Sequence, residues 1–251
     1  MRTLAISDIH GCYEQFNQLL KKVQFDSAND KLILLGDYVD RGLRSKDVLE
    51  QVKALKEEFG VIALRGNHDQ MMYDALMQER EDLDSRWIRN GARQTIESYC
   101  GADYFGEELD RGRFNEAKQL IKNNYMHHVE FLNSLDLYYE SDSHIFVHAG
   151  INPAVDEWKK QTSADFIWIR ENFYNHPTGL DKTVVFGHTP VVNLHDSENV
   201  WFSSLGDKIG IDGGCVFGKQ LNCLEIDESD EYKTYYILKD YPSLFDAIEV
   251  T

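Results

Sequence analysis

Five short apolar runs in this chain each lead directly into polar side chains that can bind metal ions, and no other feature constrains the fold as much. Each run is predicted to be a buried β-strand, because it is continuous, brief and followed by a glycine-containing loop. The carboxyl ends of strands form the ligand-binding edge of open α/β sheets, so we expect the five loops to meet. The loops are Ser7-Asp8-Ile9-His10-Gly11, Gly36-Asp37-Tyr38-Val39-Asp40-Arg41-Gly42, Arg65-Gly66-Asn67-His68-Asp69, His148-Ala149-Gly150 and Gly187-His188-Thr189-Pro190.

Predicted helices separate the first strands. Apolar residues such as Phe16, Leu19, Leu20 and Val23 recur at helical spacing, which predicts a helix with one buried face. Short connections in this order predict parallel strands joined by right-handed crossovers. From residue 200 onward, short apolar runs and frequent turns predict a second, β-rich sheet that covers the first. The five strands are expected near residues 4–6, 31–35, 61–64, 144–147 and 183–186.

Residues 69–143 interrupt this alternation, because they show helical spacing but no convincing strand. The stretch is too long to be an ordinary connection. We therefore interpret residues about 70–142 as a helical insertion packed over or beside the ligand-binding edge, within a single domain of residues 1–251. Arginines recur in the insertion and suit phosphate contacts, although solvated helix faces account for most of them.

The charge and the cysteines limit the partners and the compartment. With 26 Lys and Arg against 43 Asp and Glu, the formal net charge is −17, which argues against nonspecific binding to DNA or RNA phosphates. Bound cations can still reverse the field locally. The four cysteines show no C-x-x-C spacing, and no apolar run resembles a signal region or a membrane span. We therefore expect a cytoplasmic protein with neither a polynucleotide nor a membrane partner.

The five loops offer a mixed set of oxygen and nitrogen donors. Asp8 and His10 are two residues apart, so in an extended segment their side chains point the same way and can hold one cation. The two oxygens of Asp37 can bridge two cations. Such a set suits Mn, Fe or Zn better than Ca or Mg. The predicted ligands are Asp8, His10 and Asp37 for one ion, and Asp37, Asn67, His148 and His188 for the other.

A charge count supports this assignment. Two divalent ions contribute four positive charges and the carboxylates of Asp8 and Asp37 remove two, so the site keeps about two positive charges, enough to hold hydroxide and phosphate. Ions spaced ~3.5–4 Å apart can lower the pKa of a water from 15.7 towards ~7. The predicted reaction is attack of that hydroxide on phosphorus, in line and without a covalent intermediate.

The leaving alkoxide of such a reaction needs a proton. His68 is adjacent to a predicted ligand and is the candidate general acid, with Asp40 as the partner that orients its ring. Arg41 and Arg65 lie beside predicted ligands, so they are candidates to bind the phosphoryl oxygens, and Arg170 is a more distant candidate.

Each loop alone is weak evidence, because Asp-x-His is often a surface turn and a single histidine is often a satisfied core residue. The agreement of five strand ends is what favours the metal site. The aromatic residues Tyr38, Trp87 and Trp168 match no such pattern, and we interpret them as packing residues.

The order and separation of these motifs, over about residues 5–190, resemble those of the metallophosphoesterases and, within them, the phosphoprotein phosphatase superfamily. The resemblance implies a four-layer α-β-β-α sandwich and a dinuclear centre, with Mn as the usual metal of bacterial members. It implies the same ligand and acid roles as above, and phosphate binding by Arg41 and Arg170. The late turn Gly213–Gly218 and the segment Trp87–Tyr99 further resemble the bacterial and phage serine/threonine phosphatases.

The predicted function is therefore a metal-dependent phosphoester hydrolase that acts on a phosphorylated protein or a small phosphoester. One alternative is a symmetrical diadenosine tetraphosphate hydrolase, since that relative shares Gly11-Cys12-Tyr13 and His148-Ala149-Gly150-Ile151, but Asp40 and Thr189 favour phosphomonoester cleavage. Another is a metal-binding scaffold without catalysis, which the complete set of ligands and the acid disfavours.

Overall fold

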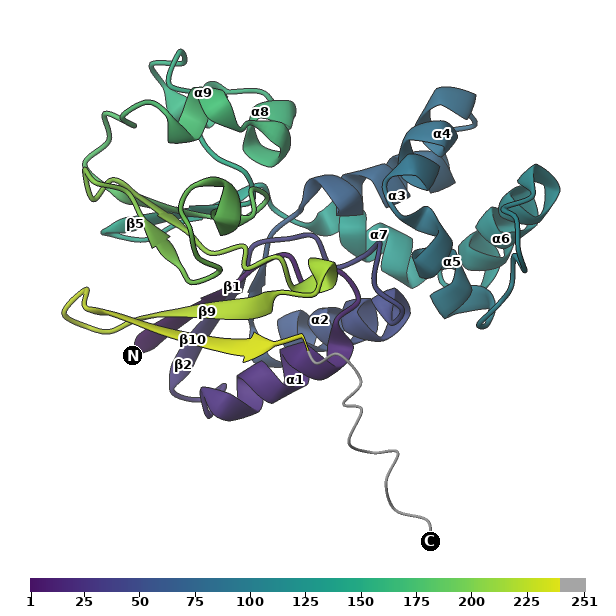
Figure 1. Ribbon diagram of the computed structural model, residues 1–251, viewed down its shortest axis with the longest axis horizontal. Helices are drawn as coiled ribbons and strands as arrows, with labels where there is room; N and C mark the ends of the chain where they lie inside the picture. The colour runs from purple at the N-terminus through teal and green to yellow at the C-terminus, as the bar shows by residue number, and fades with distance from the viewer. Residues whose placement is uncertain (240–251) are drawn as a thin grey trace, which may run out of the picture.

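The computed structural model describes residues 1–239, and its strands form two five-stranded sheets (Figure 1). The first sheet has the order β10-β9-β1-β2-β3. Its three N-terminal strands run parallel, as predicted, while β9 pairs antiparallel with β1 and β10 antiparallel with β9. The strands are β1 (Arg2–Ile6), β2 (Asp30–Leu34), β3 (Ile62–Ala63), β9 (Gln220–Ile226) and β10 (Tyr232–Leu238).

The second sheet has the order β4-β5-β6-β8-β7. The strands β5, β6 and β8 run parallel, and the two edge strands pair antiparallel with their neighbours. Both sheets therefore combine a parallel centre with at least one antiparallel edge. The strands are β4 (Tyr138–Glu140), β5 (His144–Val147), β6 (Thr183–Phe186), β7 (Trp201–Phe202) and β8 (Lys208–Gly210).

Two expectations about the strands were wrong. The C-terminal strands do not form a sheet of their own, because β7 and β8 join the second sheet whereas β9 and β10 extend the first. The stretch expected to lack strands contains β4, so its helical part ends at Ser134. The strand β4 has only three half-buried residues and gains its extended form from pairing with β5, which no local pattern announces.

The alternation of side chains along the strands builds the layers. Successive residues of a strand point to opposite faces, so Ile33 and Leu35 of the second run enter a core between the two sheets, while Leu32 and Leu34 face the helices on the outer side. Phe146 of β5 likewise enters the inner core. Burial on both faces explains why these runs are continuously apolar.

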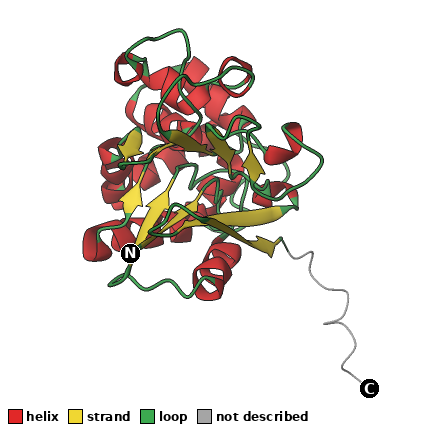
Figure 2. Ribbon diagram, turned by 90° about the vertical axis from the view of Figure 1, so that its left-hand side faces the viewer, coloured by secondary structure: helices red, strands yellow, loops and turns green. Residues whose placement is uncertain are grey.

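Helices cover both outer faces of the sandwich, and Figure 2 shows the strands between them. The helices α1 (Tyr13–Lys22) and α2 (Ser45–Phe59) pack on the first sheet through residues such as Phe16 and Val48. The helices α8 (Ser163–Trp168) and α9 (Glu171–Tyr174) pack on the second sheet. This is the four-layer α-β-β-α arrangement. Short 3₁₀ turns are η1 (Trp158–Lys160), η2 (Val191–Asn193) and η3 (Cys215–Phe217).

Five further helices fill the chain between β3 and β4 and gather at one end of the molecule, to the right in Figure 1. Their buried residues, such as Met72, Trp87 and Phe114, share one apolar core with α1 and α2. The insertion is thus continuous with the sandwich core, and the interpretation of residues 1–251 as one domain stays a prediction, because residues 240–251 lie outside the described chain. The helices are α3 (Asn67–Met77), α4 (Glu81–Arg89), α5 (Ala92–Cys100), α6 (Arg111–Asn124) and α7 (Met126–Ser134). Within residues 1–239, no helix is both long and apolar enough to cross a membrane.

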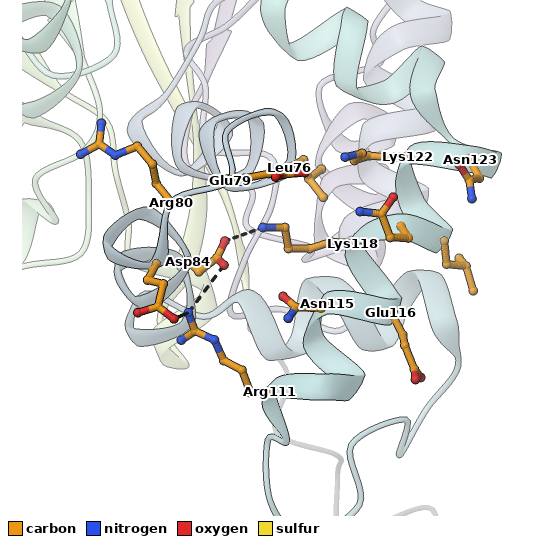
Figure 3. A pocket seen from close by; sticks show the side chains of 13 residues that line it. Leu76, Glu79, Arg80, Asp84, Arg111, Asn115, Glu116, Lys118, Lys122 and Asn123 are labelled. Atoms are coloured by element: carbon orange, nitrogen blue, oxygen red, sulfur yellow. Dashed lines mark hydrogen bonds and ion pairs between the residues drawn. The ribbon is translucent and has the colours of Figure 1, made fainter.

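A buried ion pair joins α4 to α6 inside the insertion. Lys118 Nζ lies 2.6 Å from Asp84 Oδ1, and both side chains are only 8 % exposed. Figure 3 shows the pair at the wall of a cavity of ≈ 790 Å³, with Arg111 reaching the second oxygen of Asp84 at 3.9 Å. A buried charge that loses its partner keeps its desolvation cost, so such pairs are expensive to break singly.

We expect Lys118→Met to lower the free energy of unfolding by on the order of 3 kcal/mol, because Asp84 would lose its nearest cation. The double variant Lys118→Met with Asp84→Leu should recover most of that loss, since an apolar pair needs no compensation. Urea unfolding measures both, with Lys122→Met on the same helix as the control. A double variant no more stable than the single one would contradict the ion-pair explanation.

Candidate metal centre

The loops after β1, β2, β3, β5 and β6 bring the predicted ligands into one cluster. Asp37 is its centre, because its Oδ2 lies 3.4 Å from His10 Nε2 and 3.5 Å from His148 Nε2. The ligand atoms of Asp37, His148 and His188 all lie within 4.8 Å of one another. The predicted ligands are at most 5 % exposed, so each is held inside the protein at the junction of the two sheets.

Each histidine in the cluster is oriented by a backbone carbonyl. His10 Nδ1 lies 2.7 Å from the carbonyl oxygen of Val39, and His148 Nδ1 lies 2.8 Å from that of Leu35. The backbone of Trp168 also interacts with the ring of His188, which favours the protonated ring and raises its pKa against the larger lowering by burial. A carbonyl can only accept, so Nδ1 of His10 and His148 must carry the proton, which leaves each Nε2 with a free lone pair. Metal-binding histidines typically donate their other ring N–H to a carbonyl or carboxylate in this way.

The Nε2 lone pairs of His148 and His188 face no donor among the described residues, whereas Arg41 Nη1 lies 3.1 Å from His10 Nε2. Asn67 Oδ1, an acceptor, lies 2.9 Å from His148 Nε2, which is also an acceptor in this tautomer. Among the described residues, the buried Nε2 of His188 has no hydrogen-bond partner. Buried acceptors of this kind are costly unless a donor or a cation satisfies them. The donor set of carboxylates, imidazoles and an amide oxygen therefore fits divalent cations.

Two carboxyl groups of the cluster carry a large electrostatic cost in the absence of cations. Burial raises the pKa of Asp37 well above its usual range, and the neighbouring Asp8 and Asp69 raise it further. Burial and Asp8 raise the pKa of Asp212 in the same way. Asp212 lines the same cavity as Asp8 and Asp37. A cation between these groups would favour their ionised forms.

The backbone at the cluster is strained in a way that is rare elsewhere in the chain. Nine non-glycine residues of the described chain have positive φ, and six of them belong to the predicted site. Left-handed backbone costs a non-glycine residue of the order of 1–3 kcal/mol and persists where the surroundings fix it. The six are Asp8, His10, Asp37, Asp40, Arg41 and His188.

Asp69 is one of the groups that fix this backbone. Its carboxylate accepts the backbone N–H of Asp37 and of Gly66 at 2.8 Å, and that of Tyr38 at 3.0 Å. The Asp37 carboxylate packs against Gly66, where a Cβ would lie 2.1 Å from Asp37 Oδ1. Glycine is therefore required at position 66. Asp69 was not among the predicted site residues, although it directly follows the Asn67-His68 pair.

The predicted acid and its partner lie beside the ligands. His68 Nδ1 is 2.7 Å from Asp40 Oδ2, and the pair is almost fully buried. Burial lowers the pKa of His68 well below its usual value, with a further contribution from Arg41. Burial also raises the pKa of Asp40 to about 7. Both shifts have one cause, since a dry site penalises the charged form of each group.

The structure separates the three predicted phosphate-binding arginines. Arg41 and Arg170 line a small cavity of ≈ 130 Å³, together with Asp8, Asp37 and His68. Arg65 lies elsewhere, because its guanidinium donates to Gln70 Oε1 at 2.8 Å and to backbone carbonyls of Asn133 and Leu135 near the end of α7.

The insertion contributes residues that the sequence analysis did not place in the site. Trp87 of α4 and Thr95 of α5 both hydrogen-bond the Asp40 carboxylate, so Trp87, interpreted as a packing residue, packs in the core and also donates to the site. Trp168, also interpreted as packing, lines the cavity, as does Phe217 of η3. Neither spacing nor strand position signals these residues, because they reach the site through tertiary packing.

Comparisons with known proteins place this arrangement in context. Residues 1–213 match the family model described as calcineurin-like phosphoesterase. The chain is 30 % identical over 224 residues to serine/threonine-protein phosphatase 1 of Salmonella typhimurium, covering 88 % of this chain and 90 % of the relative. It is 23 % identical over 300 residues to a symmetrical bis(5'-nucleosyl)-tetraphosphatase of Vibrio campbellii, covering 92 % and 98 %.

A solved structure shares the fold. A protein serine/threonine phosphatase from Saccharomyces cerevisiae superposes with a TM-score of 0.60 over 97 % of this chain and 82 % of the other, at 13 % identity. At that identity the likeness speaks for the sandwich fold alone.

We expect divalent metal binding to release protons from the buried carboxyl groups of the candidate metal centre. Burial raises the pKa values of Asp37 and Asp212, and a bound cation would favour their ionised forms, so metal affinity should rise with pH. Calorimetric titration with Mn²⁺ in buffers of different ionisation enthalpy measures the release. Asp37→Asn should release fewer protons and bind less metal, whereas Asp181→Asn, an exposed residue at the opposite end of β6, should match the wild type. Equal enthalpies in all buffers would contradict this account.

Proposed function

Because the chain belongs to the calcineurin-like phosphoesterase family and is a phosphoric ester hydrolase, we propose that it acts as a serine/threonine-type phosphoprotein phosphatase. The observation that carries the proposal is the buried His68–Asp40 pair, 2.7 Å apart and beside the ligand cluster, of which His68 lines a cavity together with two arginines. The 30 % identity to a bacterial serine/threonine phosphatase supports the same substrate class.

The proposed centre holds two divalent cations. Mn is the ion that we propose, with Fe or Zn as alternatives, because the donors mix oxygen and nitrogen. When bound, such ions neutralise phosphate charge and lower the pKa of a coordinated water. The proposed ligands remain Asp8, His10 and Asp37 for one ion, and Asp37, Asn67, His148 and His188 for the other.

Arg41 and Arg170 are the proposed phosphate-binding residues. Arg41 Nη1 lies 3.1 Å from His10 Nε2, and Arg170 Nη1 donates to Thr189 Oγ1 at 3.4 Å. Their guanidinium groups can donate paired hydrogen bonds to phosphoryl oxygens. Arg65, also a sequence candidate, is held by carbonyls outside this cavity, so we leave it out of the proposed phosphate site.

His68 is proposed to protonate the leaving oxygen. Its Nδ1–H donates to Asp40, which turns the opposite nitrogen, Nε2, towards the reacting side of the ring. The low pKa of the buried ring would be raised by a phosphate dianion in the cavity, because a nearby negative charge favours the imidazolium form. After the proton leaves Nε2, the neutral ring keeps its bond to the Asp40 carboxylate.

A dinucleoside tetraphosphate is the second candidate substrate. The symmetrical tetraphosphatase of Vibrio campbellii is related over 92 % of this chain, and two aromatic side chains, Trp168 and the 58 % exposed Phe217, line the cavity. Aromatic faces at the mouth of a phosphate site can stack on a base. A scaffold role without catalysis has less support, since the ligand set and the acid are complete.

The proposal places the reaction in the cytoplasm, without a polynucleotide or membrane partner. The four cysteines lie within residues 1–239 and are free thiols, which is typical of a reducing compartment. The net charge of −17 also opposes binding to polynucleotides.

The test of the function compares three substrates with the Mn-loaded protein: a phosphoserine peptide, p-nitrophenyl phosphate and diadenosine tetraphosphate. We expect the highest kcat/KM on the phosphomonoesters, because the cavity of ≈ 130 Å³ suits one phosphoryl group. A clear preference for diadenosine tetraphosphate would replace the first candidate with the second. A metal-replete protein that turns over none of the three would favour the scaffold.

We expect His68→Ala to lower kcat on the phosphoserine peptide by roughly 10²–10⁴-fold, the usual contribution of a general acid. Asp40→Asn should lower kcat as well, because the ring of His68 loses its anionic partner. Both variants should retain their metal, measured by inductively coupled plasma mass spectrometry, since neither residue is a proposed ligand. His176→Ala, at an exposed position, is the control. Loss of both metals in His68→Ala or Asp40→Asn would reject the acid assignment.

A further inference from the structure

We propose that Trp87 and Thr95, on helices α4 and α5 of the insertion, are positioning residues that fix the Asp40 carboxylate and, through it, the proton-donating ring of His68. The inference rests on the proposed roles of His68 and Asp40. It assigns to the insertion a part in the reaction, because two of its helices hold the acid partner through hydrogen bonds.

The two oxygens of the Asp40 carboxylate have different partners: one accepts from the insertion and the other contacts His68. Oδ1 accepts the indole N–H of Trp87 at 2.8 Å and the hydroxyl of Thr95 at 2.8 Å. Oδ2 lies 2.7 Å from His68 Nδ1. Asp40, Trp87 and Thr95 are each fully buried, so water cannot substitute for either donor. With three partners in place, the carboxylate cannot rotate without breaking a bond.

The same part of the insertion also holds the backbone of Asp40 and Arg41, which we call the acid loop. Thr95 Oγ1 accepts the backbone N–H of Asp40 at 2.8 Å, and the carbonyl oxygen of Gly91 accepts that of Arg41 at 3.2 Å. Asp40 and Arg41 have φ values of +74° and +70°, a conformation that non-glycine residues keep only under external constraint. At Gly91, a Cβ would lie 2.8 Å from the backbone nitrogen of Arg41, so the hairpin between α4 and α5 approaches the loop as closely as it can.

Packing alone does not account for this arrangement. Trp87 does pack edge-on against Phe114, with ring centroids 5.9 Å apart, and a phenylalanine at position 87 would serve that contact. The indole adds an N–H donor, and this N–H binds the carboxylate of Asp40, which in turn holds the predicted acid His68. A valine at position 95 would fill the space of Thr95 but would remove one donor from Asp40 Oδ1 and the nearest acceptor from the Asp40 N–H.

The chemistry makes a positioning role separable from a structural one. When the P–O bond to the leaving group breaks, its electron pair stays on the leaving oxygen, which takes the proton from His68 Nε2. A serine alkoxide is strongly basic and needs that proton, whereas p-nitrophenolate is weakly basic and leaves without it. Losing the alignment of His68 therefore slows alkyl phosphates selectively, while general damage to the fold slows both substrates equally.

The experiment measures kcat and KM of the Mn-loaded enzyme on a phosphoserine peptide and on p-nitrophenyl phosphate, for Trp87→Phe, Thr95→Val and Thr95→Ser. We expect Trp87→Phe and Thr95→Val to lower kcat on the peptide roughly tenfold, part of the 10²–10⁴-fold that a general acid contributes. The kcat on p-nitrophenyl phosphate should change by less than about threefold, with KM and metal content unchanged. Thr95→Ser keeps the hydroxyl and should restore kcat on the peptide.

Two controls separate the possible failures. Phe114→Leu disturbs the packing of Trp87 without touching the Asp40 bonds, so any loss should be equal on both substrates. His68→Ala should show the selective loss in its largest form, and if it shows none, the proposed acid fails and the inference fails with it. If His68→Ala is selective while Trp87→Phe and Thr95→Val are wild-type, or lose both substrates equally, the positioning role alone is overturned. If Trp87→Phe does not fold, the Thr95→Val and Thr95→Ser pair decides the question.

Discussion

The candidate metal centre encloses buried acceptor atoms that have no hydrogen-bond donor within residues 1–239, and the rest of the site depends on this feature. His148 Nε2 and Asn67 Oδ1 face each other at 2.9 Å, and His188 Nε2 is buried without a partner among the described residues. The Nδ1 atoms of His10 and His148 already donate to backbone carbonyls, so their ring protons cannot move to Nε2 without breaking those bonds. Divalent cations would satisfy the acceptor atoms of His148, Asn67 and His188. They would also offset the unfavourable burial of the Asp37 carboxylate, which raises the pKa of that group. The fold tolerates the enclosure because the surrounding layers supply the stability.

Those layers explain how donors from distant parts of the chain can meet. Each central strand is buried on both faces, as Leu34 and Leu35 illustrate by facing different cores, so the loops beyond the strands are held on rigid supports. Six residues of the site adopt a left-handed backbone conformation in these loops. The carboxylate of Asp69 joins the loops of Asp37 and Gly66 by accepting three backbone N–H groups. Such strained backbone persists only where tertiary contacts fix its conformation.

The helical insertion lies beside the site and also contributes hydrogen bonds to it. It shares one apolar core with α1 and α2, and Trp87 and Thr95 reach from that core to Oδ1 of Asp40. The core that stabilises the insertion therefore also supplies two hydrogen bonds to the buried carboxylate that contacts His68. A change in the insertion can alter the acid loop without touching any predicted ligand.

The sequence by itself determined the strands that lead into the site, the parallel order of β1, β2 and β3, and the residues that converge on Asp37, because these depend on local periodicity and on the fixed position of a loop after its strand. It did not determine which sheet β7 to β10 join, the short strand β4, or the direction of Arg65. Nor did it reveal that Trp87, Thr95, Asp69 and Asp212 belong to the site. Most of these are decided by partners far away in the chain, and β4 is decided by pairing with the next strand. Periodicity carries no information about either kind of partner. Only the packing of the layers and of the insertion brings those groups together.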